Sequence, residues 1–293
     1  MYIKKSIKII AGLCFLILLG TKLYAQTSEN NKSLLWKIST KNSTHISYLF
    51  GTIHLICPDE FVWTPSMHSA LNISEKVCFE MKLDDPSIMM ETALAMVNKE
   101  GKSLKDYFTV EQYATLEKYF KEKSGMDLKM FERLKPIALQ SLITADLSEC
   151  PTPVSYEDSI MKMAKSADKT ILGLETPKEQ IDVLDSQPTD SVIKDILNEI
   201  EKKSDADDEY KKLVSIYKSQ DLPELYTLLT GINGLGNEMG NFLDNRNTKW
   251  ISRMEDKMKN NSVFFAVGAG HLWGDKGVIN LLRKKGYTVE AIH

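Results

Sequence analysis

The chain has 293 residues, of which 43% are hydrophobic, 26% charged and 9% aromatic, and its formal net charge is −3. This composition excludes a disordered, collagen-like or coiled-coil protein and leaves ample apolar residue for a folded core. Proteins that bind nucleic acid or anionic membrane surfaces do so mainly through clustered Lys and Arg, so a mildly acidic chain is expected to bind neither.

The first 25 residues have the pattern of a secretory signal peptide. Three lysines precede an apolar stretch at residues 9–19, and Ala25 is a small residue suited to cleavage before Gln26. A membrane-spanning helix needs roughly 20 apolar residues. We therefore expect cleavage, export to the periplasm or beyond, and no stable membrane insertion of the mature domain, residues 26–293. An uncleaved N-terminal anchor is the alternative.

The rest of the chain follows strand and helix patterns in chain order. A polar leader at 26–33 precedes two apolar runs joined by a polar turn, which predict a hairpin. The expected strands are 34–38, 46–50, 77–81, 170–174, 263–267 and 287–292. The expected helices are 66–73, 87–148 with breaks near Gly101 and Gly125, 155–166, one starting at Pro177, 191–219 with a charged break at 202–208, 242–258 and 275–285.

Strands at both ends that enclose a long helical middle indicate a single α/β domain. We predict a mixed central sheet built from the N- and C-terminal parts, with the helical middle as a cap. A Gly-rich segment at 231–240 has no Lys-Ser or Lys-Thr after it, so it is read as a lid or hinge and not as a phosphate loop.

Two of the five histidines share one context. His54 and His271 each follow an apolar strand in a Gly-x-x-His-Leu motif, at residues 51–55 and 268–272. The glycine would let the chain turn sharply as it leaves the strand, and ligands of open α/β sheets bind at the carboxyl ends of strands. A single such motif would equally suit a histidine that bonds the backbone. The repeat favours a functional role for both.

Two further apolar strands run into a carboxylate, at Glu80 and Glu175. If the four strands are parallel neighbours, two imidazoles and two carboxylates converge, which is a ligand set for a catalytic divalent ion such as Zn²⁺, Mn²⁺ or Co²⁺. Such an ion turns its bound water into hydroxide near neutral pH, and a carboxylate that does not bind it can move protons. A surface or helix-capping role is the alternative for each glutamate.

Arg246 opens the helix that leads to Trp250. It could clamp a substrate carboxylate or an oxyanion through two hydrogen bonds. The alternative is an ion pair with Asp244 or Glu255 at the surface. The sequence contains no Gly-x-Ser-x-Gly elbow, Walker loop, His-Glu-x-x-His or Gly-x-Gly-x-x-Gly motif.

Three cysteines remain after removal of the signal peptide. Cys57 and Cys150 both lie in Pro-flanked loops, and because export permits oxidation we expect them to form a disulfide. Cys78 lies in an apolar strand, where a free thiol packs as a small hydrophobe.

These segments together resemble the TraB/GumN family, whose relatives include the Tiki metalloproteases. The resemblance rests on residues 35–38, 49–55, 79–80, 173–176 with Gln180, 246–247 and 267–272, in the family's order. It implies an α/β fold with paired Gly-x-x-His motifs and acidic residues in one pocket. By analogy with the Tiki branch it also implies Mn²⁺- or Co²⁺-dependent peptide hydrolysis, with His54, Glu80 and His271 as the core and Glu175 and Arg246 beside them.

We expect an exported, metal-dependent hydrolase, in the first place a peptidase, that acts on a peptide or a small molecule. His54, Glu80 and His271 would hold metal or activated water. Glu175 would be the general base or a further ligand, and Arg246 would stabilise the oxyanion or grip a peptide end. Two alternatives stay open. One is a protein that binds a peptide or small ligand without turnover, and the other is a metal-free hydrolase with one histidine as general base, as in the related erythromycin esterases.

Overall fold

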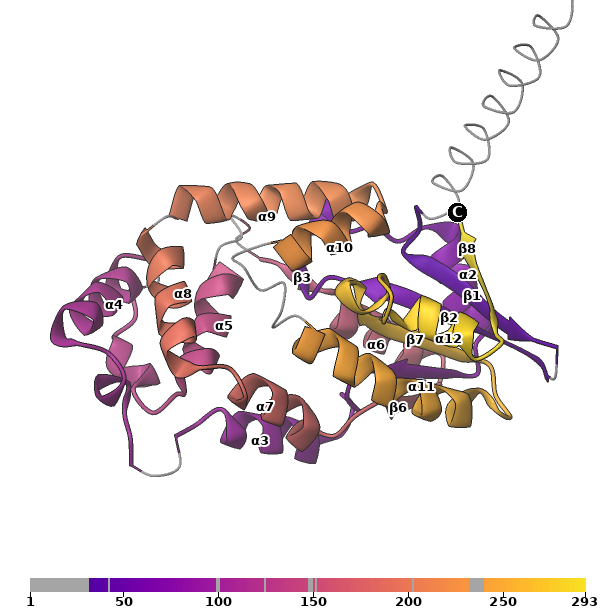
Figure 1. Ribbon diagram of the computed structural model, residues 1–293, viewed down its shortest axis with the longest axis horizontal. Helices are drawn as coiled ribbons and strands as arrows, with labels where there is room; N and C mark the ends of the chain where they lie inside the picture. Colours follow the sequence, from indigo (N-terminus) through magenta and orange to yellow (C-terminus); the bar gives the residue numbers. More distant parts are fainter. Residues whose placement is uncertain are drawn as a thin grey trace, which may run out of the picture.

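The fold is known from a computed structural model, shown in Figure 1. It describes residues 32–41, 43–98, 101–123, 125–146, 150, 152–201, 203–231 and 240–293. The predicted signal peptide and residues 232–239 of the predicted Gly-rich segment lie outside the described residues.

A mixed six-stranded sheet forms the centre of the structure. Its order is β6-β4-β7-β2-β1-β8. The bounds are Thr170–Gly173 for β6, Lys76–Phe79 for β4, Val263–Gly268 for β7, Ser43–Thr52 for β2, Leu35–Thr40 for β1 and Thr288–Ile292 for β8. β6, β4, β7 and β2 are parallel to one another, and β1 is antiparallel to both β2 and β8. The prediction of an α/β domain with a mixed sheet from both ends of the chain is confirmed.

The register aligns the carboxyl ends of the four parallel strands. Phe79 at the end of β4 lies opposite Gly173 of β6 and Ala266 of β7, and Thr52 at the end of β2 lies opposite Gly268. Side chains that follow these strands therefore emerge at one edge of the sheet.

Helices cover both faces of the sheet. In Figure 1, α11 (Asn245–Met258) and α12 (Val278–Lys284) lie in front of the strands and α6 (Tyr156–Ser166) lies behind them. α11 buries Trp250, Met254 and Met258, one residue per turn on one face, as expected of an amphipathic helix on a sheet. The core between these layers contains the fully buried Trp36, Phe50, Phe79, Phe264 and Phe265, among others.

The helical middle extends away from the sheet as a lobe with a hydrophobic core of its own (Figure 1). Its main helices are α4 (Val110–Lys123), α5 (Pro136–Asp146) and α8 (Thr189–Glu201). Leu116, Leu139 and Ile196 are fully buried between them. The remaining elements are β3 (Leu55–Ile56), α2 (Pro65–Ile73), α3 (Pro86–Ala95), β5 (Val154–Ser155), α7 (Pro177–Asp185), α9 (Lys203–Lys218), α10 (Leu222–Gly231) and the short helical turns Pro58–Glu60, Leu104–Asp106, Leu128–Phe131, Gly240–Asp244 and Ala269–His271.

The elements differ from the predicted ones at several places. α8 ends at Glu201 and α9 begins at Lys203, so one helix does end where the charged break was predicted, but the predicted length of the break, 202–208, is wrong. The helix α10 and the short strands β3 and β5 were not predicted. Helix α12 begins at Val278 and not near Asp275, because Gly277 has an extended backbone and caps it. Within the described part of the chain, no helix has the length and apolar character needed to cross a membrane.

Candidate active site

Four parallel strands deliver the predicted side chains to one edge of the sheet. Glu80 directly follows β4, and Glu175 follows β6 by two residues. His54 comes just after β2, and His271 ends the short turn Ala269–His271 that follows β7. All but Glu175 line one cavity of about 750 Å³ between the strand ends and helices α7, α9 and α10, and Glu175 lies behind Arg246 and contacts it.

The glycines of the two motifs act through close approach and not through an unusual backbone angle. Gly268 has a φ of −51°, which any residue can adopt. Its N–H donates to Oε1 of Glu80 at 2.9 Å. A Cβ at Gly51 would lie 3.1 Å from Ala269 and from the Leu272 side chain. The close neighbours therefore explain glycine at these positions, and an unusual backbone angle does not.

Arg246, from the first turn of α11, joins the two carboxylates. Its Nη2 donates to Oε2 of Glu80 at 2.6 Å and to Oε1 of Glu175 at 2.5 Å, and its Nε donates to Oε2 of Glu175 at 3.1 Å. The exposed fractions of the Arg246, Glu80 and Glu175 side chains are 11, 15 and 2%. The surface alternative for Arg246 is wrong, because Asp244 pairs with Lys276 and Glu255 with Lys285.

His271 is buried and held in one tautomer. The Asn247 amide nitrogen donates to two backbone carbonyls, which directs its Oδ1 toward Nδ1 of His271 at 2.6 Å. The Nδ1–H therefore donates to Asn247, and Nε2 accepts from Nη1 of Arg246 at 3.1 Å. Burial lowers the pKa of His271 to about 3, so the ring is neutral near pH 7. The Trp250 ring lies against it, with 4.4 Å between the ring centroids.

The two glutamates differ in electrostatic environment. Burial favours the neutral form of Glu80, but the neighbouring His271 and Arg246 side chains and the Gly268 N–H lower its pKa to about 2. Gln180 adds a bond to Oε2 at 3.3 Å. For Glu175, burial outweighs the bonds from Arg246 and Trp250 and raises the pKa. Glu80 is thus a carboxylate throughout the physiological range.

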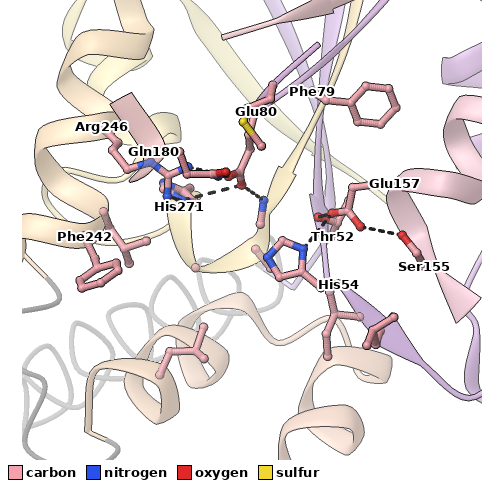
Figure 2. Close-up of a pocket in the computed structure, with 18 of the residues that line it drawn as sticks. Thr52, His54, Phe79, Glu80, Ser155, Glu157, Gln180, Phe242, Arg246 and His271 are labelled. Carbon is pink, nitrogen blue, oxygen red and sulfur yellow. Dashed lines mark hydrogen bonds and ion pairs between the residues drawn. The ribbon is translucent and has the colours of Figure 1, made fainter. Parts of the chain in front are cut away.

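His54 lies in a second polar group, separate from the first (Figure 2). Its side chain is 79% exposed, and its Nδ1 is 3.3 Å from Oε1 of Glu157. The same carboxylate accepts from the Thr52 hydroxyl at 2.7 Å and from the Ser155 hydroxyl at 3.2 Å. The bond to Glu157 and the negative charge of that carboxylate raise the pKa of His54 to about 9. His54 and His271, identical in motif, therefore have opposite environments.

Glu157, Thr52, Asn247 and Trp250 are contacts that the sequence interpretation did not assign to the site. Glu157 stands in the first turn of α6, and Ser155 is the N-cap of that helix. A serine N-cap followed by acidic residues is fully explained by helix capping. Asn247 follows Arg246 directly and Trp250 lies one helical turn after it, and this proximity to Arg246 in the sequence was the available signal.

The donor set does not fit a bound divalent metal as the side chains are placed. A catalytic site of this kind needs about three protein donors with free lone pairs facing one point. Arg246 already binds both carboxylates and Nε2 of His271, while His54 binds Glu157. In the described ranges, no group of three or more His, Cys, Asp or Glu side chains is positioned to hold a metal ion. The assignment of His54, Glu80 and His271 as ligands stays a prediction.

Cys57 and Cys150 are free thiols in the structure, so the predicted disulfide is not present in it. The two side chains are nevertheless in hydrogen-bond contact, and that contact raises the pKa of Cys57 to about 11. Cys78 is buried, as expected of a free thiol in a strand. Mass spectrometry of exported protein tests the pairing, which is refuted if both thiols are found reduced.

A parallel-sheet edge with paired Gly-x-x-His histidines, two carboxylates and an arginine defines a class of α/β proteins in which polar groups meet in a pocket at the strand ends. The chain belongs to the TraB/PrgY/gumN family, which it matches over residues 34–291. The TraB/GumN resemblance is thereby confirmed.

Curated relatives agree with this membership. The chain is 24% identical to a protein described as "Metalloprotease TIKI homolog" from Amphimedon queenslandica, over 92% of this chain and 63% of the relative. It is also 24% identical to "Metalloprotease TIKI2" (90% of this chain, 62% of the relative) and "Metalloprotease TIKI1" (92% and 65%) from Danio rerio. The chain thus spans less than two thirds of these relatives' length. No solved structure matches it significantly.

Proposed function

We propose that this protein is an exported hydrolase of peptide or ester bonds, with the cavity at the strand ends as its active site. The observation that carries the proposal is that His54, His271 and Glu80, from three different strand ends, line the same cavity. Distant similarity to proteins named metalloproteases supports hydrolysis as the reaction. Export rests on the signal-peptide pattern of residues 1–25.

His54 is the proposed acid–base group. The Glu157 carboxylate binds its Nδ1, which leaves Nε2 for water or substrate in the cavity. With a pKa of about 9, His54 acts as the base in its neutral form, whose share rises with pH. That neutral imidazole takes a proton from the attacking water, the carboxylate stabilises the imidazolium, and the imidazolium then gives the proton to the leaving group. A new C–O bond from the attacking water replaces the cleaved C–N or C–O bond, and His54 returns to its starting protonation state.

Arg246 is proposed to organise the opposite side of the cavity. Its bonds to Glu80, Glu175 and His271 use four of the five guanidinium N–H groups. Arg246 lines the cavity, and the fifth N–H, on Nη1, is proposed to donate to the oxyanion that forms during attack. Glu80 and Glu175 hold the guanidinium in place.

A comparison of two histidine variants tests the reaction. The purified protein is incubated with a peptide library and with p-nitrophenyl esters, and His54→Ala is compared with His68→Ala, an exposed histidine on α2 outside the cavity. We expect a loss of about 10²–10⁴-fold in rate for His54→Ala and none for His68→Ala. Equal rates for wild type and His54→Ala would refute the proposal. Substrate bound but recovered unchanged would favour a binding protein without turnover.

Metal dependence is tested separately, because the relatives' description suggests it and the placed donors do not fit it. Metal content and hydrolysis are measured after chelation and after loading with Mn²⁺, Co²⁺ or Zn²⁺. Bound metal that is lost from a His54→Ala/His271→Ala double variant would establish the predicted ligands. Full activity in excess chelator would assign the reaction to the protein's own groups.

A further inference from the structure

The cavity has two chemically different sides. The strand ends contribute the polar side, with His54 and Arg246. The other part of the lining comes from helices α7, α9 and α10 and the turn Gly240–Asp244, and it is mostly aliphatic or aromatic. Its apolar side chains, all only half-buried, are Val183, Leu184, Leu213, Leu229, Phe242 and Leu243. We refer to these six residues as the apolar wall.

The apolar wall is immediately next to the chemical groups. A Cβ placed at Gly270, the residue before His271, would lie 3.2 Å from Cδ1 of Leu229 and 3.7 Å from Cδ1 of Leu243. Figure 2 shows Phe242 beside Arg246 and His271 at the edge of the cavity. An apolar group bound by this wall would therefore lie close to His271 and the other polar residues at the strand ends.

On α7 and α10 these side chains occupy inward positions, while polar residues lie on the outward face of each helix. On α7, Lys178 and Asp182 form an exposed ion pair while Val183 and Leu184 face the cavity. On α10, Thr227 is exposed while Leu225 and Leu229, one turn apart, face inward. A concave, largely apolar lining with a few convergent polar groups is typical of a ligand site. Exposure of this apolar surface to water is unfavourable in free energy, so a ligand that covers it is stabilised.

The charged groups of the cavity offer little attraction to an anionic substrate. Arg246 is bonded to Glu80 and Glu175, and His54 is bonded to Glu157. The charges within each cluster largely cancel, and neither cluster carries a net positive charge. Among the described residues that line the cavity, Asp158 adds a further exposed carboxylate. For a substrate group without positive charge, apolar contact is therefore the main source of affinity that the lining provides.

We propose that the substrate carries a large uncharged apolar group, a long aliphatic or aromatic chain attached to the acyl carbon of the cleaved bond, and that the apolar wall binds it. This specificity rests on the proposed hydrolysis for its bond-breaking step, but the binding of the apolar group does not. The chain is either the side chain of a peptide residue or the acyl chain of an ester, since both present the same surface to the wall.

Binding is measured with the neutral fluorescent probe N-phenyl-1-naphthylamine. Leu229→Gln and Leu243→Gln are expected to raise its Kd at least tenfold. Leu229→Met keeps the apolar surface and is expected to change the Kd only a few-fold. The control is Leu94→Gln, an exposed leucine on α3 outside the cavity. Melting temperatures of all variants confirm that they are folded. A Kd unchanged in both glutamine variants would overturn the proposal.

Turnover is measured with p-nitrophenyl esters from acetate to hexanoate and with peptides that differ by norleucine or serine at one position. In the wild type, kcat/KM is expected to rise about fourfold per added CH₂. The substrate series that is cleaved identifies the source of the apolar chain. A flat series with His54-dependent turnover would refute the apolar specificity and leave the hydrolase intact. If the glutamine variants lose probe binding but no substrate is turned over, the apolar site is supported and the proposed hydrolysis is refuted.

Discussion

Replacing Arg246 with Met is expected to destabilise the fold strongly, because it leaves two carboxylates in the interior without their cation. The Glu175 and Glu80 side chains are only 2 and 15% exposed. Removal of one partner from a buried ion pair costs about 3–5 kcal/mol. The Trp250 indole N–H and the Gly268 N–H still donate to the carboxylates, so we expect the low end, about 3 kcal/mol. For a chain of this size, with about 2.1 cal/mol/K of unfolding entropy per residue, that corresponds to a fall in Tm of about 5 °C.

The pH dependence of this loss has a definite sign. In the wild type the pKa of Glu80 is lowered to about 2 from 4.5, so its carboxylate contributes stability above pH 4.5 that is lost as the pH falls toward 2. In Arg246→Met the buried carboxylates lack their cation, so their pKa values rise in the folded state. The variant then loses stability as the pH rises. The difference between wild type and variant is therefore largest at neutral pH and shrinks in acid.

Urea unfolding at pH 7.5 and pH 5 measures both effects. Lys276→Met serves as the control, since Lys276 pairs with Asp244 at the surface and is expected to contribute less than about 1 kcal/mol. Arg246→Met/Glu175→Gln is expected to recover part of the loss, because it removes one of the unpaired charges. A deficit for Arg246→Met below about 1 kcal/mol at pH 7.5, or an equal deficit at the two pH values, would refute the reasoning.

Three further predictions follow from single contacts. Glu157→Gln removes the carboxylate that raises the pKa of His54 to about 9, so the ascending limb of kcat/KM against pH, which reports deprotonation of the base, should move from about 9 toward 6.5; an unmoved limb would exclude His54 as the base. Arg253→Ala breaks the ion pair that lowers the pKa of Glu179 to about 2; it should cost about 0.5–1 kcal/mol in urea unfolding above pH 4.5 and progressively less toward pH 2, and a pH-independent cost would contradict this assignment. In Gly173→Ala the new Cβ would lie 2.5 Å from a backbone nitrogen after β4, so a loss of about 1–3 kcal/mol is expected in thermal unfolding; an unchanged Tm would show that the strands can separate without cost.

The fold could be predicted where hydrophobic patterning determines it. Six apolar runs became the six strands of the sheet, and their order along the chain was sufficient for an α/β class. The charged run indicated where one helix ends, but not how short the interruption is. The run at 202–208 contains Lys, Ser, Asp and Ala, which helices accommodate at small cost, and α9 already begins at Lys203. The separate core of the helical lobe also requires knowledge of which helices meet.

The convergence of the strand ends could be predicted for a physical reason, and the partners of Arg246 could not. Four parallel strands necessarily end at one edge, so residues placed just beyond them become neighbours. Arg246 bonds to residues 71 and 166 positions away. Local sequence offered Asp244 and Glu255 as partners, and nothing in the helix pattern distinguishes a surface pair from one that spans the sheet edge.

The two Gly-x-x-His motifs show most directly that local sequence does not determine the contacts of a side chain. Each places an imidazole beyond a parallel strand, and in sequence they are equivalent. His271 is buried and neutral because α11 supplies Asn247 and Arg246 to its two nitrogens. His54 is exposed and bonded to a carboxylate because β3 and β5 pair and bring Glu157 of α6 beneath it. The division of roles between the histidines is thus set by elements outside both motifs, and only the tertiary arrangement indicates that His54 is the one available to a substrate.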